Sequence, residues 1–210
     1  MKSIIFILGI LLSVIPLNAQ KIIEKHLGYG QKTKVIIDVQ IADSIKINTW
    51  NKNEVFAKAS VSINEDKDND AYETSFNDSG TEIRIEAEFK KEYFDKKNNC
   101  VNSEISWEIF IPENAVFSVK TISGNIIIAG KTSELKANTI SGFVDLTVPK
   151  NINADLSCKT ITGTIYSNHD FTLTGSKKHH SSDINEKING GGKSINLETI
   201  SGDIFFREMK

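Results

Sequence analysis

The sequence predicts an all-β fold, a right-handed β-helix-like β-solenoid with additional antiparallel strands in its N-terminal half. Three observations lead to this prediction. Beyond residue 20, polar and apolar residues alternate with a period of two in many short segments, and the spacing of an amphipathic helix is scarce. In the second half one short phrase recurs four times. A chain of 210 residues is long enough for one domain with a buried core.

Composition and charge exclude several classes of protein. The chain has 25 Lys and Arg residues against 27 Asp and Glu residues, a formal net charge of −2, so we expect no strongly basic face and no nucleic-acid partner. Two cysteines are too few for a disulfide-held scaffold, and three prolines with 13 glycines exclude collagen-like and proline-rich chains. A folded, mildly acidic protein remains.

The N-terminus has the pattern of a secretory signal peptide. Lys2 precedes a nearly uninterrupted apolar run, Ile4–Ile15, and the small residue Ala19 stands before a polar segment. We predict a signal peptide over 1–19 and a single domain over 20–210. The apolar run is shorter than the roughly 20 residues that span a membrane, and no second run follows, so we expect no membrane span after cleavage. These features predict an exported protein of the periplasm or the cell surface.

The first half of the chain shows short alternating strands separated by turns. Asn51-Lys52-Asn53 is a predicted turn, because Asn tolerates turn dihedrals. Two charged stretches, 65–70 and 90–99, are predicted to be solvated hairpin loops. The predicted strands lie near residues 33–39, 44–49, 54–63, 72–77, 81–89 and 104–111.

The recurring phrase of the second half has the form Thr-Ile-Ser/Thr-Gly, followed one residue later by Ile or Val. Its glycines are separated by 18, 21 and 39 residues, and the last interval is close to two periods, with a degenerate copy expected around 175–192. The signature of leucine-rich repeats is missing, so the period predicts stacked β-coils, clearest in 115–210. The phrases begin at Thr121, Thr139, Thr160 and Thr199.

Side-chain parity predicts a corner within each phrase. Apolar residues before the phrase, such as Phe117 and Val119, share the parity of its threonine, whereas those after it, such as Ile126, share the parity of its isoleucine. Because side chains of a strand alternate between faces, both sets point inward only if the chain bends between Thr and Ile. We therefore expect an interior isoleucine column, with glycine allowing the tight backbone. The predicted corner residues are Ile122, Gly124, Ile140, Gly142, Ile161, Gly163, Ile200 and Gly202.

Three further segments accompany the four phrases: the turn Asn189-Gly190-Gly191-Gly192, the segment Ile195–Ile204 that follows it, and the earlier segment Ile45–Val55. With these features the chain resembles the putative-adhesin family of exported bacterial β-strand-repeat proteins over most of its mature length. The resemblance implies a right-handed β-helix-like fold, a bacterial envelope or extracellular setting, and an adhesive or surface role. It implies no catalytic residues.

The two cysteines of an exported chain are candidates for a disulfide. Cys158 has the inward parity of Val119, whereas Cys100 follows a polar loop. We predict that they do not pair and that Cys158 is a buried free thiol.

Candidate metal ligands do not form a strong pattern. The segment Asp66–Asp70 alternates acids as a calcium loop does, but Ala71 stands where an EF-hand has Gly and Asn77 where it has a bidentate Glu, so an EF-hand is excluded. We interpret the segment as a solvated loop, with a weak calcium contact of another kind left open. The histidines within 169–180 lack thiolates or a third spaced ligand, so we interpret them as loop residues. We expect no cofactor.

The sequence also lacks the usual cluster of catalytic residues. Polysaccharide-degrading β-helices carry clustered acids or bases across several coils, and that cluster is missing here. The outward corner hydroxyls have no neighbouring histidine or paired carboxylates to activate them, and we interpret them as backbone hydrogen-bonding groups. These hydroxyls belong to Ser123, Ser141, Thr162 and Ser201.

One row of side chains predicts a contact surface. If Ile126 and its equivalents face inward, the next residue on each strand faces outward, and most of these residues are apolar or aromatic. Apolar stripes of this kind are rarely left exposed to solvent. The row is therefore either a binding surface or a seat, that is, the surface on which the first-half strands pack, and we favour the seat. The predicted contact stripe consists of Ile127, Phe143, Asp145, Tyr166 and Phe205.

The sequence therefore predicts an exported, non-enzymatic binding module with a role in adhesion or in envelope-associated binding. Its partner would be a surface glycan or an envelope protein. Two alternatives stay open: a protein-binding envelope sensor or structural module, and, with less support, a carbohydrate-active β-helix enzyme.

Overall fold

The computed structural model describes residues 19–95, 101–169 and 183–209, and within these ranges the chain is all-β apart from a 3-10 turn and one short helix. The predicted signal peptide lies almost wholly outside the described residues. The helical elements are η1 (Asn69–Ala71) and α1 (Lys91–Asp95). The strands are β1 (Lys21–Gly28), β2 (Lys34–Val39), β3 (Ile41–Trp50), β4 (Glu54–Ile63), β5 (Tyr72–Asp78), β6 (Glu82–Phe89), β7 (Ser103–Pro112), β8 (Val116–Ala129), β9 (Leu135–Ser141), β10 (Val144–Val148), β11 (Ala154–Thr160), β12 (Ile165–Ser167), β13 (Asp183–Ile188), β14 (Lys193–Ser201) and β15 (Ile204–Glu208).

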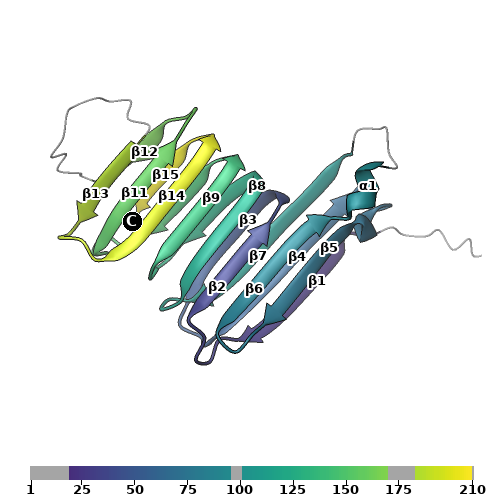
Figure 1. The fold of residues 1–210 in the computed structure, drawn as a ribbon, viewed down its shortest axis with the longest axis horizontal. Helices are drawn as coiled ribbons and strands as arrows, with labels where there is room; N and C mark the ends of the chain where they lie inside the picture. The colour runs from purple at the N-terminus through teal and green to yellow at the C-terminus, as the bar shows by residue number, and fades with distance from the viewer. Residues whose placement is uncertain (1–18, 96–100, 170–182, 210) are drawn as a thin grey trace, which may run out of the picture.

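These fifteen strands form one sheet that is folded into two layers (Figure 1). The fold occurs within β8, because its first half pairs with β2 and β9 whereas its second half pairs with β3 and β10. Layer A contains β5, β6, β2, the first half of β8, β9, β14, β11 and β13 in spatial order. Layer B contains β1, β4, β7, β3, the second half of β8, β10, β15 and β12. The strands run parallel through the middle of both layers. The pairs at both ends of layer A and at the β1 end of layer B are antiparallel, whereas β12 at the other end of layer B runs parallel to β15.

The core fills the space between the two layers. Alternate residues of each strand are buried, as in β4 and β6. Trp107 of layer B donates its indole Nε1–H to the hydroxyl of Tyr72 in layer A over 3.2 Å, in a buried position. The same hydroxyl donates to the backbone oxygen of Ile41 over 3.1 Å. The two layers are therefore joined by a polar contact as well as by apolar packing.

The coils formed by the four phrases do not stack in chain order. β9 pairs with β14, and β14 pairs with β11, so the fourth phrase lies between the second and the third. The described part of the expected degenerate copy contains β13, which runs antiparallel to β11 instead of forming a further parallel coil. The all-β prediction is confirmed, but the observed sheet is not closed and does not show the regular right-handed solenoid expected from consecutive repeats.

The predicted strands of the first half agree with the observed ones, and β1 was not predicted. The charged stretches, however, are not hairpin loops. Residues 65–70 join β4 of layer B to β5 of layer A through η1, and residues 90–99 include α1 on the way from β6 to β7. Both stretches connect strands of different layers, which sequence alternation does not reveal. Residues 96–100 lie outside the described range.

The predicted interior isoleucine column is wrong. Ile122, Ile140, Ile200 and Ile161 are 45%, 45%, 46% and 63% exposed, whereas the threonine before each of them is buried. The Ser or Thr after each isoleucine is also exposed, so two consecutive side chains point outward at every corner. The change of parity is confirmed, but it occurs between Ile and Ser/Thr instead of between Thr and Ile.

Hydrogen bonding explains why threonine takes the inner position. The Thr139 hydroxyl donates to the backbone oxygen of Gly124 in the neighbouring coil over 3.1 Å, and Thr199 donates to Gly142 over 3.0 Å. Thr160 donates to Gly202 over 2.8 Å. A buried or partly buried carbonyl at the corner needs a hydrogen-bond donor, and isoleucine has none. The isoleucine is therefore placed on the surface.

Candidate functional site

The predicted contact stripe forms a single row on the outer face of layer B. Ile127 of β8 lies beside Asp145 of β10, Asp145 beside Phe205 of β15, and Phe205 beside Tyr166 of β12. These strands are parallel and in register, so their equivalent outward side chains line up across the layer. Phe143, which precedes β10, joins the row with its ring centroid 5.9 Å from that of Phe205. The structure thus brings all five residues together.

The rings of the stripe pack on one another and stay accessible to solvent. Tyr166 and Phe205 are stacked, with ring centroids 5.2 Å apart and an interplanar angle of 12°. Tyr166 is 50% exposed, and Phe143 and Phe205 are partly buried. The guanidinium of Arg207 lies 4.9 Å from the centre of the Phe205 ring. This arrangement presents ring faces and a cation at one surface.

Asp145 is the only acidic residue in the stripe, and it is largely buried among the stripe's apolar groups. Its Oδ2 lies 3.1 Å from Nη2 of Arg207, and its side chain is 16% exposed. Its Oδ1 has no hydrogen-bond partner among the described residues. Burial raises the pKa of this carboxyl, and the charge of Arg207 opposes that shift. The stripe therefore contains one carboxylate that is paired with Arg207 and whose Oδ1 is buried from solvent.

The first-half strands do not sit on the stripe. Strands β2, β5 and β6 belong to layer A, and β3, β7, β4 and β1 extend layer B sideways from β8. The row therefore continues from Ile127 into Lys46, Glu108, Lys58 and Glu24. Charges alternate along this continuation, and Lys58 and Glu24 form an ion pair of 2.8 Å. Within the described residues, the favoured interpretation of the stripe as a seat for these strands is wrong. The outer face of layer B is instead divided into a charged half and an aromatic half.

Sequence reasoning missed a second aromatic cluster on the charged half. The rings of Phe56 and Phe110 lie 6.2 Å apart, and those of Trp50 and Phe110 lie 5.1 Å apart. His26 lies 4.6 Å from Phe56, and the Lys52 amine lies 4.4 Å from the centre of the Trp50 ring. The outward parity of the aromatic residues was visible in the sequence, but their closeness depends on the non-sequential pairing of β4 with β7.

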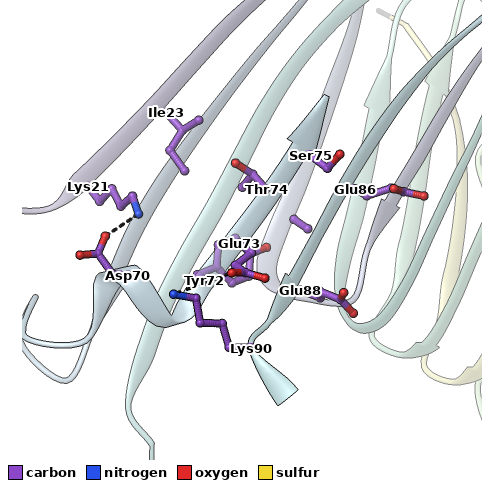
Figure 2. A pocket seen from close by; sticks show the side chains of 11 residues that line it. Lys21, Ile23, Asp70, Tyr72, Glu73, Thr74, Ser75, Glu86, Glu88 and Lys90 are labelled. Carbon is purple, nitrogen blue, oxygen red and sulfur yellow. Dashed lines mark hydrogen bonds and ion pairs between the residues drawn. The ribbon is translucent and has the colours of Figure 1, made fainter. Parts of the chain in front are cut away.

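A cleft of about 680 Å³ opens between β1 and β5, at the end of the stack opposite to the stripe (Figure 2). Lys21 and Ile23 of β1 line one side, and β5 with β6 lines the other. Lys21 reaches Asp70 over 2.8 Å, and Lys90 lies 3.7 Å from Glu73. The cleft thus contains both apolar groups and ion pairs.

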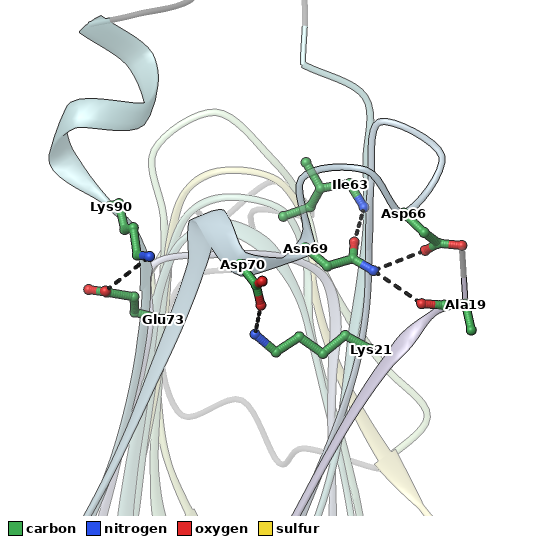
Figure 3. A network of polar contacts seen from close by, with 8 residues as sticks. All are labelled: Ala19, Lys21, Ile63, Asp66, Asn69, Asp70, Glu73 and Lys90. Atoms are coloured by element: carbon green, nitrogen blue, oxygen red, sulfur yellow. Dashed lines mark hydrogen bonds and ion pairs between the residues drawn. The ribbon is translucent and has the colours of Figure 1, made fainter. Parts of the chain in front are cut away.

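The predicted calcium-like segment is used in contacts within the chain (Figure 3). Asn69 Oδ1 accepts the backbone N–H of Ile63 over 2.7 Å, and its amide nitrogen donates to Asp66 and to the backbone oxygen of Ala19. Asp70 pairs with Lys21. Within the described residues, no group of three or more His, Cys, Asp or Glu side chains is placed to hold a metal ion. The polar groups of this segment hold the connection between the layers.

The corner hydroxyls are exposed, and that of Thr162 donates to the backbone oxygen of Ile200 over 3.2 Å. His169 follows β12, with its Nε2 3.3 Å from Oε1 of Glu208 at the end of β15. The other histidines of the segment 169–180, with Asp170, lie outside the described residues. No helix in the described ranges has the length and apolar character needed to cross a membrane.

Cys158 is buried and free, as predicted, while Cys100 lies outside the described residues. Burial raises the pKa of the Cys158 thiol to about 12, with a smaller contribution from the charge of Asp183. In a Cys100→Ser background we expect native Cys158 to react with a small disulfide reagent at pH 8 about a thousandfold more slowly than an exposed thiol, because the thiolate fraction falls about tenfold per pKa unit. The control carries a cysteine at the exposed position of Ser194. Equal rates for the two thiols contradict the expectation.

Comparison with known proteins shows a shared fold. No family model matches the chain, and no curated protein matches it. A crystal structure from Clostridium sporogenes, described as a putative cell adhesion protein, has a TM-score of 0.58 and 17% identity, and covers 91% of this chain and 100% of that chain. A putative adhesin from Bacteroides fragilis has a TM-score of 0.36 and 12% identity, and covers 91% of this chain and 99% of that one. The first likeness shows that this chain shares its fold with the protein described as a putative cell adhesion protein.

Proposed function

We propose that the chain is an exported, non-enzymatic binding module, an adhesin or an envelope-associated protein, and that the stripe is its contact surface. The observation that carries this proposal is the in-register row of stacked, accessible rings on a face that no described strand covers. Accessible apolar patches on folded proteins mark interaction sites, and Tyr and Phe with Arg are typical of them. The fold shared with the Clostridium sporogenes protein supports an adhesive role.

The partner in this proposal is a surface glycan or an envelope protein. Rings present flat apolar faces, and the half-exposed guanidinium of Arg207 provides hydrogen-bond donors beside them. Glycoside hydrolysis by the usual route needs two carboxyl groups flanking the bond, whereas the stripe carries one. The proposed activity is therefore binding without turnover, and no cofactor is involved.

A double substitution of the stripe tests the proposal. We expect Tyr166→Ser with Phe205→Ser to leave the thermal midpoint nearly unchanged and to weaken retention on immobilised envelope polysaccharides or intact cells by at least about tenfold, since each ring contact contributes about 0.5–1.5 kcal/mol. The matched control, Lys46→Ser with Glu108→Ser, changes the charged half of the same face. A lowered thermal midpoint with unchanged retention would show that the rings serve packing instead.

Fractionation with protease shaving of intact cells separates an adhesin from a periplasmic module. An adhesin is cut from intact cells, whereas a protein confined to the periplasm is protected. Release of product from a polysaccharide panel would contradict the non-enzymatic part of the proposal.

A further inference from the structure

β5 is an edge strand with unused backbone hydrogen-bonding groups. Within the described residues it pairs only with β6. The hydrogen bonds from Lys90 N–H to Ala71 O and from Ser79 N–H to Glu82 O show which alternate residues of β5 turn their backbone groups toward β6. In an antiparallel pair every second residue turns its N–H and C=O to the neighbour. Thr74 and Phe76 therefore turn theirs away from β6. Neither amide has a hydrogen-bond partner among the described residues, so the edge can accept another strand.

The free edge of β5 borders the cleft shown in Figure 2. Thr74 and Phe76 share the inward parity of buried Tyr72, and both are partly exposed. The Phe76 ring lies 6.3 Å from that of buried Trp107, and Ile23 of β1 is partly buried against the core. A strand added here would place alternate side chains between the layers, against these apolar groups. Lys21 also lines the cleft but is paired with Asp70, so the inward residues that meet Phe76 and Ile23 should be apolar.

The outer side of the same edge is acidic. Glu73 of β5 lies directly opposite Glu88 of β6, and Glu86, which Arg84 approaches to 3.7 Å, follows on the same face. Like charges directly opposite one another destabilise a sheet. Lys90 approaches Glu73 only to 3.7 Å, and Glu88 accepts a hydrogen bond from the neutral side chain of Gln40. Lysine or arginine on the outer face of an added strand would lie beside these carboxylates.

We propose that β5 is a docking edge for an extended segment of a partner protein in which basic and apolar residues alternate. The segment adds to layer A through main-chain hydrogen bonds to Thr74 and Phe76, with apolar residues facing Ile23 and basic residues facing Glu73. This edge lies at the opposite end of the stack from the stripe, so the proposal is independent of the proposed function.

Two other occupants of this end fit less well. A second copy of β5 would bring its own Glu73 beside an acidic face. The other edge strand, β1, carries Lys21 and Lys25 at the inward parity of buried Leu27. Inward-pointing charges on an edge strand are a known protection against strand addition. The charge pattern therefore favours β5 over β1 as the edge that accepts another strand, and it favours a basic strand as the one that binds there.

Two capped heptapeptides test the proposal on the chain from residue 20 onward. One alternates lysine with valine, and the other has glutamate in place of lysine. We expect the lysine peptide to bind about tenfold more tightly at low salt, because its two or three exposed ion pairs are individually weak and act together. Hydrogen exchange followed by nuclear magnetic resonance should show slower exchange of the Thr74 and Phe76 amides when the lysine peptide is bound.

Three variants separate β5 docking from other causes. Thr74→Pro removes an amide that points away from β6, as proline does without harm on edge strands, and should abolish binding. Ile22→Pro makes the equivalent change on the free edge of β1 and should leave binding intact. Glu73→Lys should reverse the preference between the two peptides, and it keeps the proposal testable if the proline variant fails to fold. Equal binding of both peptides, protection of β1 amides instead of β5 amides, or a dimer in solution that Thr74→Pro dissociates would overturn the proposal.

Discussion

Gly142→Ala is expected to destabilise the protein by about 3–5 kcal/mol, enough to unfold a domain of ordinary stability. Gly142 has a φ of +139°, a conformation that L side chains rarely adopt, and an added Cβ would overlap the backbone oxygen of Gly124 in the neighbouring coil. That oxygen also accepts the hydrogen bond from Thr139, so the backbone cannot move away without losing the bond. The energetic costs of overpacking and of backbone strain therefore both apply at Gly142.

Urea denaturation followed by circular dichroism measures this loss. The control is Gly80→Ala in the turn before β6, where an added Cβ meets no atom within 4 Å and φ is not in the left-handed region. We expect that variant to keep nearly the stability of the parent chain. Equal stability of the two variants would show that the coils do not approach one another through their glycines.

Trp107→Ala is expected to cost about 3–5 kcal/mol, the usual loss when a large aromatic side chain is removed from a core. Trp107 is 1% exposed, and its indole N–H is bonded to the hydroxyl of Tyr72 in the opposite layer. Burial raises the pKa of the Tyr72 hydroxyl, which therefore stays protonated and donates to Ile41. The substitution leaves a cavity and removes one of the polar links between the layers.

The other tryptophan of the chain is a matched control. Trp50 lies partly exposed on the outer face of layer B, where its N–H donates to the backbone oxygen of Glu54 over 2.8 Å. We expect Trp50→Ala to cost less than about 2 kcal/mol, since less apolar surface returns to water. Tyr72→Phe should cost about 2 kcal/mol, because it removes two hydrogen bonds and leaves the buried indole N–H of Trp107 without its acceptor. A larger loss for Trp50→Ala than for Trp107→Ala in urea denaturation would contradict the described core.

The alternation of polar and apolar residues within short segments predicted most of the strands and the residues of the stripe. The parity of Ile126 and Val144 placed them in the core, where both are fully buried, and placed Ile127 and Phe205 on the opposite face. Parity depends only on neighbours within one strand, so it can be followed along the chain without knowledge of the fold. Strand β1 escaped this reasoning because its burial is set by one neighbour, β4, at the edge of the layer.

The corner was predicted at the wrong residue because hydrophobicity and hydrogen bonding compete there. Isoleucine is the more apolar residue of each Thr-Ile pair, which favoured an interior isoleucine. The buried carbonyl of a glycine in the next coil requires a donor, and threonine provides it. Such a requirement is visible only when the neighbouring coil is in place.

By itself, the amino-acid sequence determined the all-β class, the strand positions, the repeat and the residues of the stripe, because these follow from alternation and turn chemistry within short segments. The tertiary structure decided the order of the coils, the outward isoleucines, the bare outer face of the stripe and the open edge of β5. These features depend on pairs far apart in the chain, such as Thr199 with Gly142, which are 57 residues apart. Register, backbone hydrogen bonds and close glycine contacts between coils determine which strands are neighbours. These interactions join residues far apart in the chain, so short sequence segments do not reveal them.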